Sequence, residues 1–191
     1  MSDRRLVVGL GNPGFEYALT RHNVGFMVLD ELAEALGVSL SVEHPLGLWS
    51  PPALKGTGQV VLLKPMTYMN LSGKAVSFLA RRMGLAPSQV LVVYDDMSLP
   101  FGRLRLRGSG SAGGHRGMAS VIGALGTPEV PRLRVGIGSP PPGVDASTYV
   151  LSPFSEEEME ALPEVLERAC RAVELWLDES LDKAMSLVNG R

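Results

Sequence analysis

Side chains that can move a proton or orient a water molecule follow expected strand ends in this chain. His22 lies in the polar segment 17–25, and Asp95 ends a later apolar strand. Residues at the ends of neighbouring parallel strands face one crevice, and a carboxylate bonded to Nδ1 of a histidine leaves Nε2 free as a general base. Asn12 follows the first strand, at the edge where ligands bind in open α/β sheets. The pattern predicts hydrolysis by a base-activated water.

Other chemistries have weaker support in the sequence. Ser109 and Ser111 lie among glycines, but their spacing does not form a G-x-S-x-G elbow. Cys170 is at helical spacing with apolar neighbours, which is typical of a core position. The three histidines, His22, His44 and His115, share no metal-ligand spacing. We therefore expect neither a metal nor a cofactor.

A glycine motif at residues 9–14 matches the G-x-G-x-x-G pattern of dinucleotide-binding proteins. That fingerprint needs its third glycine inside a helix and an acidic residue at the end of the next strand. Here Asn12-Pro13-Gly14 is a turn sequence, and Asp30 falls in the middle of an expected helix. We reject the dinucleotide interpretation, although a nucleotide-binding oxidoreductase remains a distant alternative.

Strands and helices alternate around these residues. Apolar runs predict strands at residues 4–10, 59–64, 89–94 and 132–137, and strict alternation predicts another at 103–107. Helical spacing predicts helices at residues 24–36, 73–83, 117–125, from 155 onward, and 180–188. We expect residues 39–58 to be irregular. Pro163 should kink the helix after residue 155 or split off its first turn.

This pattern predicts the fold class. Alternating strands and helices indicate a single α/β domain over residues 1–191, with a twisted mixed β-sheet flanked by helices on both faces. The 45% hydrophobic content and net charge of −2 exclude a disordered chain, and the single cysteine excludes a disulfide framework. Apolar runs are shorter than the ~18 residues of a membrane span. A strand begins after five residues, so we expect no signal peptide, no membrane association and a cytoplasmic location.

Charge is divided along the chain. Residues 155–182 hold ten acidic side chains against two arginines. Residues 101–140 instead hold one acid, Glu129, and the six arginines 103, 105, 107, 116, 132 and 134. A basic face on an acidic protein suits an anionic ligand, whereas the plainer alternative is a set of solvated strand arginines.

Four stretches resemble the signature motifs of bacterial peptidyl-tRNA hydrolases. They are GLGNPGFEYALTRHNVGF from residue 9, KPMTYMNLSG from residue 64, YDDMSLPFG from residue 94 and GSAGGHRG from residue 110. The LRVGIG strand and the YVLSPF segment before the acidic helix are also similar. The resemblance implies cleavage of the ester between a peptide and its tRNA, by a monomeric enzyme without a metal.

The resemblance also implies roles for individual residues. His22 would activate water, Asp95 would orient His22 and stabilise its charge, and Asn12 would lie beside the scissile ester. Asn70 would bind the substrate backbone. The cleft would be lined by Tyr17, Tyr68 and Met69, and His115 would stand at its rim, near the peptide or the 3′ end.

The tRNA contacts depend on arginines. We expect Arg103, Arg105, Arg132 and Arg134 to contact tRNA, together with Arg116. The family commonly has asparagine at the position of Arg116, and the loop 139–145 lacks the basic residue that many members carry. Arg116 would reach a phosphate or the terminal ribose, or form an ion pair with Asp96 or Glu129. An RNA-binding module without chemistry is the main alternative function.

Overall fold

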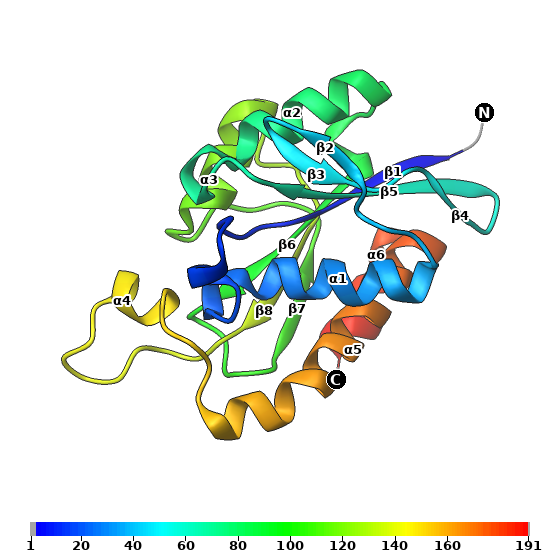
Figure 1. Cartoon of the computed structure of the whole chain (residues 1–191). Coiled ribbons are helices and arrows are strands. Elements are labelled where there is room, and N and C mark those ends of the chain that lie inside the picture. Colours follow the sequence, from blue (N-terminus) through cyan, green and yellow to red (C-terminus); the bar gives the residue numbers. More distant parts are fainter. Residues whose placement is uncertain (1–2, 191) are drawn as a thin grey trace.

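A mixed eight-stranded sheet forms the centre of the protein (Figure 1). The structure is a computed structural model that describes residues 3–190. Four strands run parallel in the order β5-β1-β6-β8: Gly58–Pro65 (β5), Arg4–Gly9 (β1), Val90–Asp96 (β6) and Arg132–Gly136 (β8). The antiparallel strands lie at the edges: Val42–His44 (β2), Gly47–Trp49 (β3), Ala53–Lys55 (β4) and Leu104–Arg107 (β7). The predicted mixed α/β sheet is confirmed.

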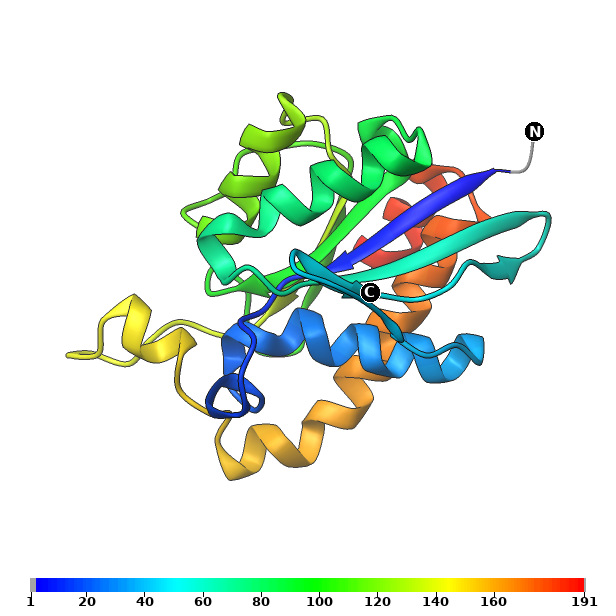
Figure 2. The same cartoon turned by 45° about the horizontal axis from the view of Figure 1, so that its top comes forward.

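Helices cover both faces of this sheet, as predicted (Figure 2). One face packs against Val24–Leu36 (α1), Glu156–Asp178 (α5) and Leu181–Asn189 (α6). The other face packs against Ser72–Met83 (α2) and Arg116–Leu125 (α3). The short helix Ala146–Val150 (α4) stands apart from these layers, beside the carboxyl ends of the parallel strands. The described part of the chain also contains four 3₁₀ turns: Phe15–Tyr17 (η1), Arg21–Asn23 (η2), Met69–Leu71 (η3) and Pro87–Gln89 (η4).

Local chemistry explains where the main elements begin and end. The first five residues of β6 are apolar and buried, as expected of a strand covered on both faces. Gly37 ends α1 in the left-handed region with φ 65°, where glycine avoids a Cβ clash. Ser155 and Glu158 form the predicted capping box of α5. Pro163 does not split α5, which continues as one helix to Asp178.

The expectation of an irregular segment at residues 39–58 is wrong. The chain there forms β2, β3 and β4, and the last two pair with different parts of β5. Each of these strands has three residues, too few for an alternating pattern to be read from sequence. The buried hydroxyl of Ser50 accepts from the Leu62 N–H at 3.0 Å and so joins this segment to β5.

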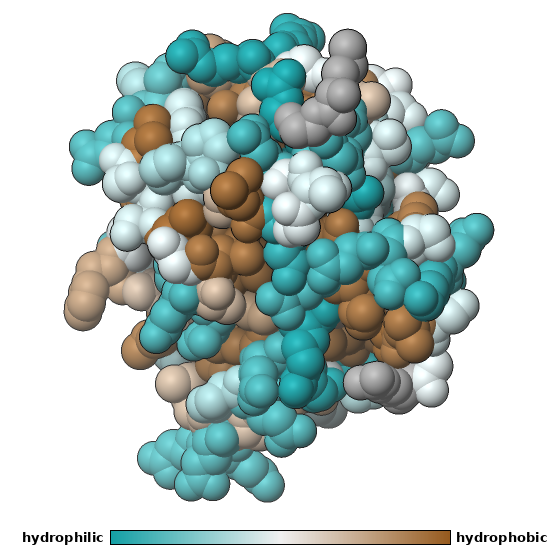
Figure 3. All heavy atoms as spheres, turned by 90° about the vertical axis from the view of Figure 1, so that its right-hand side faces the viewer, coloured by the Kyte–Doolittle hydropathy of each residue, from teal (hydrophilic) through white to brown (hydrophobic). Residues whose placement is uncertain are grey.

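One face of the molecule carries both polar and apolar side chains (Figure 3). On the face that Figure 3 shows, hydrophilic side chains separate the apolar atoms into distinct patches. Among residues 3–190, each helix is too short or too polar to cross a membrane.

Candidate active site

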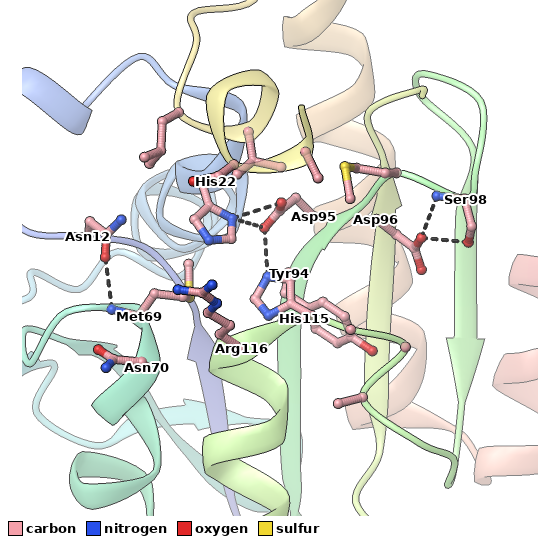
Figure 4. Close-up of a pocket in the computed structure, with 18 of the residues that line it drawn as sticks. Asn12, His22, Met69, Asn70, Tyr94, Asp95, Asp96, Ser98, His115 and Arg116 are labelled. Carbon is pink, nitrogen blue, oxygen red and sulfur yellow. Dashed lines mark hydrogen bonds and ion pairs between the residues drawn. The ribbon is translucent and has the colours of Figure 1, made fainter. Parts of the chain in front are cut away.

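A cleft of about 710 Å³ opens at the carboxyl edge of the parallel strands. Its wall comes from the turn after β1, the segment around η3, the end of β6, the glycine loop before α3, and α4 (Figure 4). This is the edge where open α/β sheets bind ligands. Asn12, His22, Asp95 and Asn70 all line it, as the sequence predicts.

His22 and Asp95 meet in this cleft. Nδ1 of His22 lies 3.0 Å from Oδ1 and 2.9 Å from Oδ2 of Asp95. Burial of Asp95 acts to raise the pKa of its carboxyl, but electrostatic interaction and hydrogen bonds with His115 and His22 outweigh burial and hold that pKa below its usual range. A charged carboxylate accepts a hydrogen bond from Nδ1–H, so the proton of the neutral ring is on Nδ1 and Nε2 of His22 keeps its lone pair. Nε2 takes part in none of the hydrogen bonds described for residues 3–190.

His115 does not stand at the rim, and that expectation is wrong. Its Nε2 lies 2.9 Å from Oδ1 of Asp95, and its ring centroid lies 5.0 Å from that of His22. His115 is also the N-cap of α3, where Nδ1 accepts the Met118 N–H at 3.1 Å. Asp95 therefore bonds to both histidines (Figure 4). The proximity of His22 and His115 could not be predicted from their spacing, because the two rings come from segments far apart in the sequence.

His22, Asp95 and His115 are also residue types that can bind a metal ion. One ligand atom each from His22, Asp95 and His115 lie within 4.8 Å of one another. Since Nδ1 of His115 accepts from Met118, the ring proton sits on Nε2, which faces Asp95. A metal on that Nε2 would move the proton to Nδ1, against the Met118 N–H. The arrangement therefore suits hydrogen bonding better than metal ligation.

Asn12 is fixed from two sides. Its Oδ1 accepts the Met69 N–H at 2.8 Å. Asn23 accepts the Asn12 N–H and donates to the Asn12 carbonyl, both at 2.9 Å. The amide Nδ2 of Asn12 is left as the donor available to a ligand. Asn23 is not among the residues predicted from the sequence, although a polar residue directly after His22 was a signal for it.

Tyr68 has a strained backbone beside the cleft. It is the one non-glycine residue with a positive φ among residues 3–190, with φ 64° and ψ 158°. Its side chain is exposed and lines the cleft, together with buried Met69 and exposed Asn70. Such strain persists where the surroundings enforce it, often at functional sites. Tyr17, by contrast, does not line the cleft, so its expected place there is wrong.

The predicted tRNA-binding arginines differ in burial: some lie at the surface of β7 and β8, whereas Arg132 is buried. Arg105 lies opposite Arg134 on the paired strands β7 and β8, next to exposed Arg103. Arg132 is 2% exposed, and its three guanidinium nitrogens donate to the carbonyls of Val130, Ser111 and Pro128. The expectation that Arg132 binds tRNA is wrong, because its nitrogens are bonded to carbonyls of the glycine loop and of the segment before β8.

Arg134 and Arg116 differ in their partners. Arg134 donates to Asp96 at 2.6 Å and to the Ser98 hydroxyl at 3.2 Å. Arg116 lines the cleft and points toward His22 in Figure 4. Within residues 3–190 it makes no ion pair, so the expected alternative of a pair with Asp96 or Glu129 is not realised.

Comparison with known proteins decides the family. A family model described as peptidyl-tRNA hydrolase matches residues 6–191. The chain belongs to the peptidyl-tRNA hydrolase family. The peptidyl-tRNA hydrolase of Desulfitobacterium hafniense is 51% identical over 185 residues, covering 97% of this chain and 99% of that protein. That of Aquifex aeolicus is 50% identical over 187 residues, covering 98% and 97%.

Solved structures of peptidyl-tRNA hydrolase have the same fold. The crystal structure of peptidyl-tRNA hydrolase from Acinetobacter baumannii superposes with a TM-score of 0.90 at 35% identity, covering 99% of this chain and 96% of that one. The resemblance drawn from the four sequence motifs is therefore confirmed. In the fold, these motifs supply most of the cleft wall, and α4 supplies the remainder.

Proposed function

We propose that this protein hydrolyses the ester bond between a peptide and tRNA, releasing tRNA for reuse, as a cytoplasmic monomer. Membership of the peptidyl-tRNA hydrolase family supports the reaction. The observation that carries the mechanism is the hydrogen bond from Nδ1 of His22 to Asp95 inside the cleft. That bond leaves Nε2 of His22 as the base.

The proposed reaction has two steps. Nε2 of His22 takes a proton from water as the water oxygen attacks the ester carbonyl carbon, and Asp95 stabilises the resulting imidazolium. The tetrahedral intermediate then expels the ribose oxygen of the tRNA, which receives the proton from Nε2. The products are the peptide acid and a free tRNA hydroxyl, and these steps use no metal or cofactor.

Asn12 and Asn70 are proposed to hold the substrate around that reaction. Nδ2 of Asn12 is the free end of a side chain anchored by Met69, so it can donate to a peptide carbonyl beside the ester. A bound carbonyl of this kind exists in peptidyl-tRNA and is absent from a free aminoacyl group. Asn70 and Tyr68 would contact the peptide backbone, and Tyr17, outside the cleft, would contact more distant parts of the substrate.

The tRNA is proposed to lie along the basic edge of β7 and β8. Arg103, Arg105 and Arg107 enter no ion pair among residues 3–190, and Arg134 is partly neutralised by Asp96. Free guanidinium groups on one face suit a run of phosphates. Arg116 lines the same cleft as His22 and points toward it in Figure 4, where it would reach a phosphate or the ribose at the acceptor end.

The decisive experiment compares N-blocked aminoacyl-tRNA with unblocked aminoacyl-tRNA as substrates. We expect hydrolysis of the blocked form, little hydrolysis of the unblocked form, and loss of both in His22→Ala. Binding of tRNA without hydrolysis of either substrate would instead favour an RNA-binding module. Equal hydrolysis of both forms would contradict the role proposed for Asn12.

A further inference from the structure

His115 has two hydrogen-bonding partners that fix the position of its ring proton. Nδ1 accepts the Met118 N–H at 3.1 Å, so the neutral ring carries its proton on Nε2. Nε2 then donates to Oδ1 of Asp95 at 2.9 Å. The N-cap of α3 thereby makes His115 a hydrogen-bond donor to Asp95.

The chain around His115 is shaped to bring the ring to this place. Gly113 and Gly114 have φ of 58° and 84°, so the loop turns sharply through conformations that favour glycine. A Cβ on Gly117 would lie 2.4 Å from Sδ of Met69 and 3.1 Å from Cε1 of His115. Glycine at 117 thus allows the first turn of α3 to approach the cleft wall closely.

Asp95 therefore accepts hydrogen bonds from two histidines. It is 3% exposed, and its Oδ1 is shared between His22 and His115 while Oδ2 faces His22. A buried carboxylate needs several donors to stay charged, and two donors on different sides also fix its rotation. The orientation in which Asp95 accepts from His22 depends on the second donor.

We propose that His115 is a positioning residue for hydrolysis, which holds the Asp95 carboxylate in the orientation that His22 needs. This inference rests on the proposed function, because it assigns His22 as the base. The hydrogen bond from His115 also weakens the electrostatic interaction between Asp95 and His22. Without that hydrogen bond, Asp95 would stabilise the imidazolium of His22 more strongly, so His22 would stay protonated to a higher pH.

Other charged and titratable groups near this cluster remain the same in the experiment. Arg116 projects from α3, and Arg21 precedes His22 and is paired with Glu158 of α5 at 2.8 Å. The sheet contributes Tyr94, whose ring lies 4.8 Å from that of His115, together with Asp96, Arg132 and Arg134. From α4, the lining residues are uncharged, and the N-cap Asp145 bonds to Thr148.

Two substitutions separate the two hydrogen bonds of His115. In His115→Asn, the amide oxygen replaces Nδ1 and can still cap α3, but nothing replaces the Nε2 donor. In His115→Gln, the longer side chain places an amide N–H where Nε2 lies, while the cap is lost. The measurements are kcat, KM, the pH dependence of kcat/KM and the melting temperature of each full-length variant.

We expect loss of the Nε2 donor to lower kcat, and loss of the α3 cap to lower the melting temperature. His115→Asn should lower kcat by about tenfold or more, the usual effect of losing a hydrogen bond to a charged group. The acid limb of its kcat/KM profile should move to higher pH. His115→Gln should retain most of kcat and the position of that limb, but melt a few degrees lower.

Each outcome bears on the proposal. A His115→Asn variant with wild-type kcat and an unmoved acid limb would overturn it, as would equal kinetic loss in both variants. His22→Ala, tested in parallel, separates this inference from the mechanism. If His22→Ala is inactive while His115→Asn is normal, only the role of His115 fails. If His22→Ala is active, the assignment of the base fails.

Discussion

In the proposed mechanism, His22 supplies the lone pair that accepts a proton, and Asp95 supplies a fixed negative charge beside it. The carboxylate is buried and stays ionised because its pKa is held below the usual range by the two histidines. It contributes a fixed negative charge next to Nδ1 of His22 at 2.9 Å. In the proposed reaction, the proton that His22 takes from water would therefore be stabilised without movement of the protein.

Substitutions in this pair should reduce kcat far more than they change KM. His22→Ala removes the base, for which a loss of about 10²–10⁴-fold is typical. Asp95→Asn keeps the shape but supplies a neutral amide, which cannot stabilise imidazolium, so we expect most of the rate to be lost. Steady-state kinetics on N-blocked aminoacyl-tRNA measure both. Near wild-type kcat in either variant would show that the base is elsewhere.

The pH dependence should have the same origin. Because Asp95 remains charged at and above its ordinary titration range, a fall of kcat/KM on mild acidification reports protonation of His22. The expected profile is high at neutral pH and falls as acid converts Nε2 to N–H. Measurement between pH 5 and 8 at constant ionic strength tests this, and activity that rises on acidification would contradict it.

Tyr68 is the second residue whose conformation predicts an effect. Its φ of 64° and ψ of 158° form a region occupied almost only by glycine, at a cost of about 1–3 kcal/mol for other residues. Tyr68→Gly should therefore raise the free energy of unfolding while weakening binding, because the exposed ring at the cleft is removed. Denaturant unfolding and KM measure the two effects. Tyr68→Phe is the control, since it keeps the strain and most of the ring.

At the scale of elements, the sequence predicts long segments well and short ones poorly. The helix over residues 24–36 matches α1 at both ends because apolar spacing and Gly37 define it. The edge strands β2 to β4 leave no such pattern, since their pairing with each other and with β5 depends on the finished sheet. The position of His115 was equally unreadable, because it depends on how the glycine loop folds back toward Asp95.

Arg132 shows the same limit for a side chain. Its strand alternates arginine with apolar residues, as β7 does, and nothing local tells a solvated arginine from a buried one. Only the folded chain places the carbonyls of Val130, Ser111 and Pro128 around its guanidinium. This arginine belongs to the architecture of the loop that carries His115.

Replacing Arg132 should therefore destabilise the protein more than replacing its neighbours. Arg132→Met leaves three carbonyls without a donor, at a cost of about 1–3 kcal/mol for each one that stays buried. We expect a fall of roughly 2–5 kcal/mol in the free energy of unfolding. Arg105→Met, from the paired strand, is the matched control and should change stability little. Equal losses by urea unfolding would contradict the structural role.

At the scale of the whole molecule, the charges are arranged so that the acidic helix and the basic edge are separate. The ten acidic residues of 155–182 lie mainly on α5, which packs on the α1 face of the sheet. Of the arginines on β7 and β8, Arg134 pairs with Asp96 of the cleft wall, and Arg105 lies opposite Arg134. A net charge of −2 therefore coexists with a local positive field that can attract tRNA.

This arrangement predicts a salt dependence for tRNA binding. If three or four arginines contact phosphates, the logarithm of the association constant should fall against the logarithm of salt concentration with a slope of about −2 to −4. Arg105→Gln and Arg116→Asn should each make the slope shallower by about one contact, and Arg116→Asn should raise KM with kcat nearly unchanged. Arg171→Gln, on α5, is the control of equal charge change, because Arg171 pairs with Glu167 on the acidic helix. A flat salt response, or an equal change of slope in Arg171→Gln, would remove the basic edge from the proposed tRNA site.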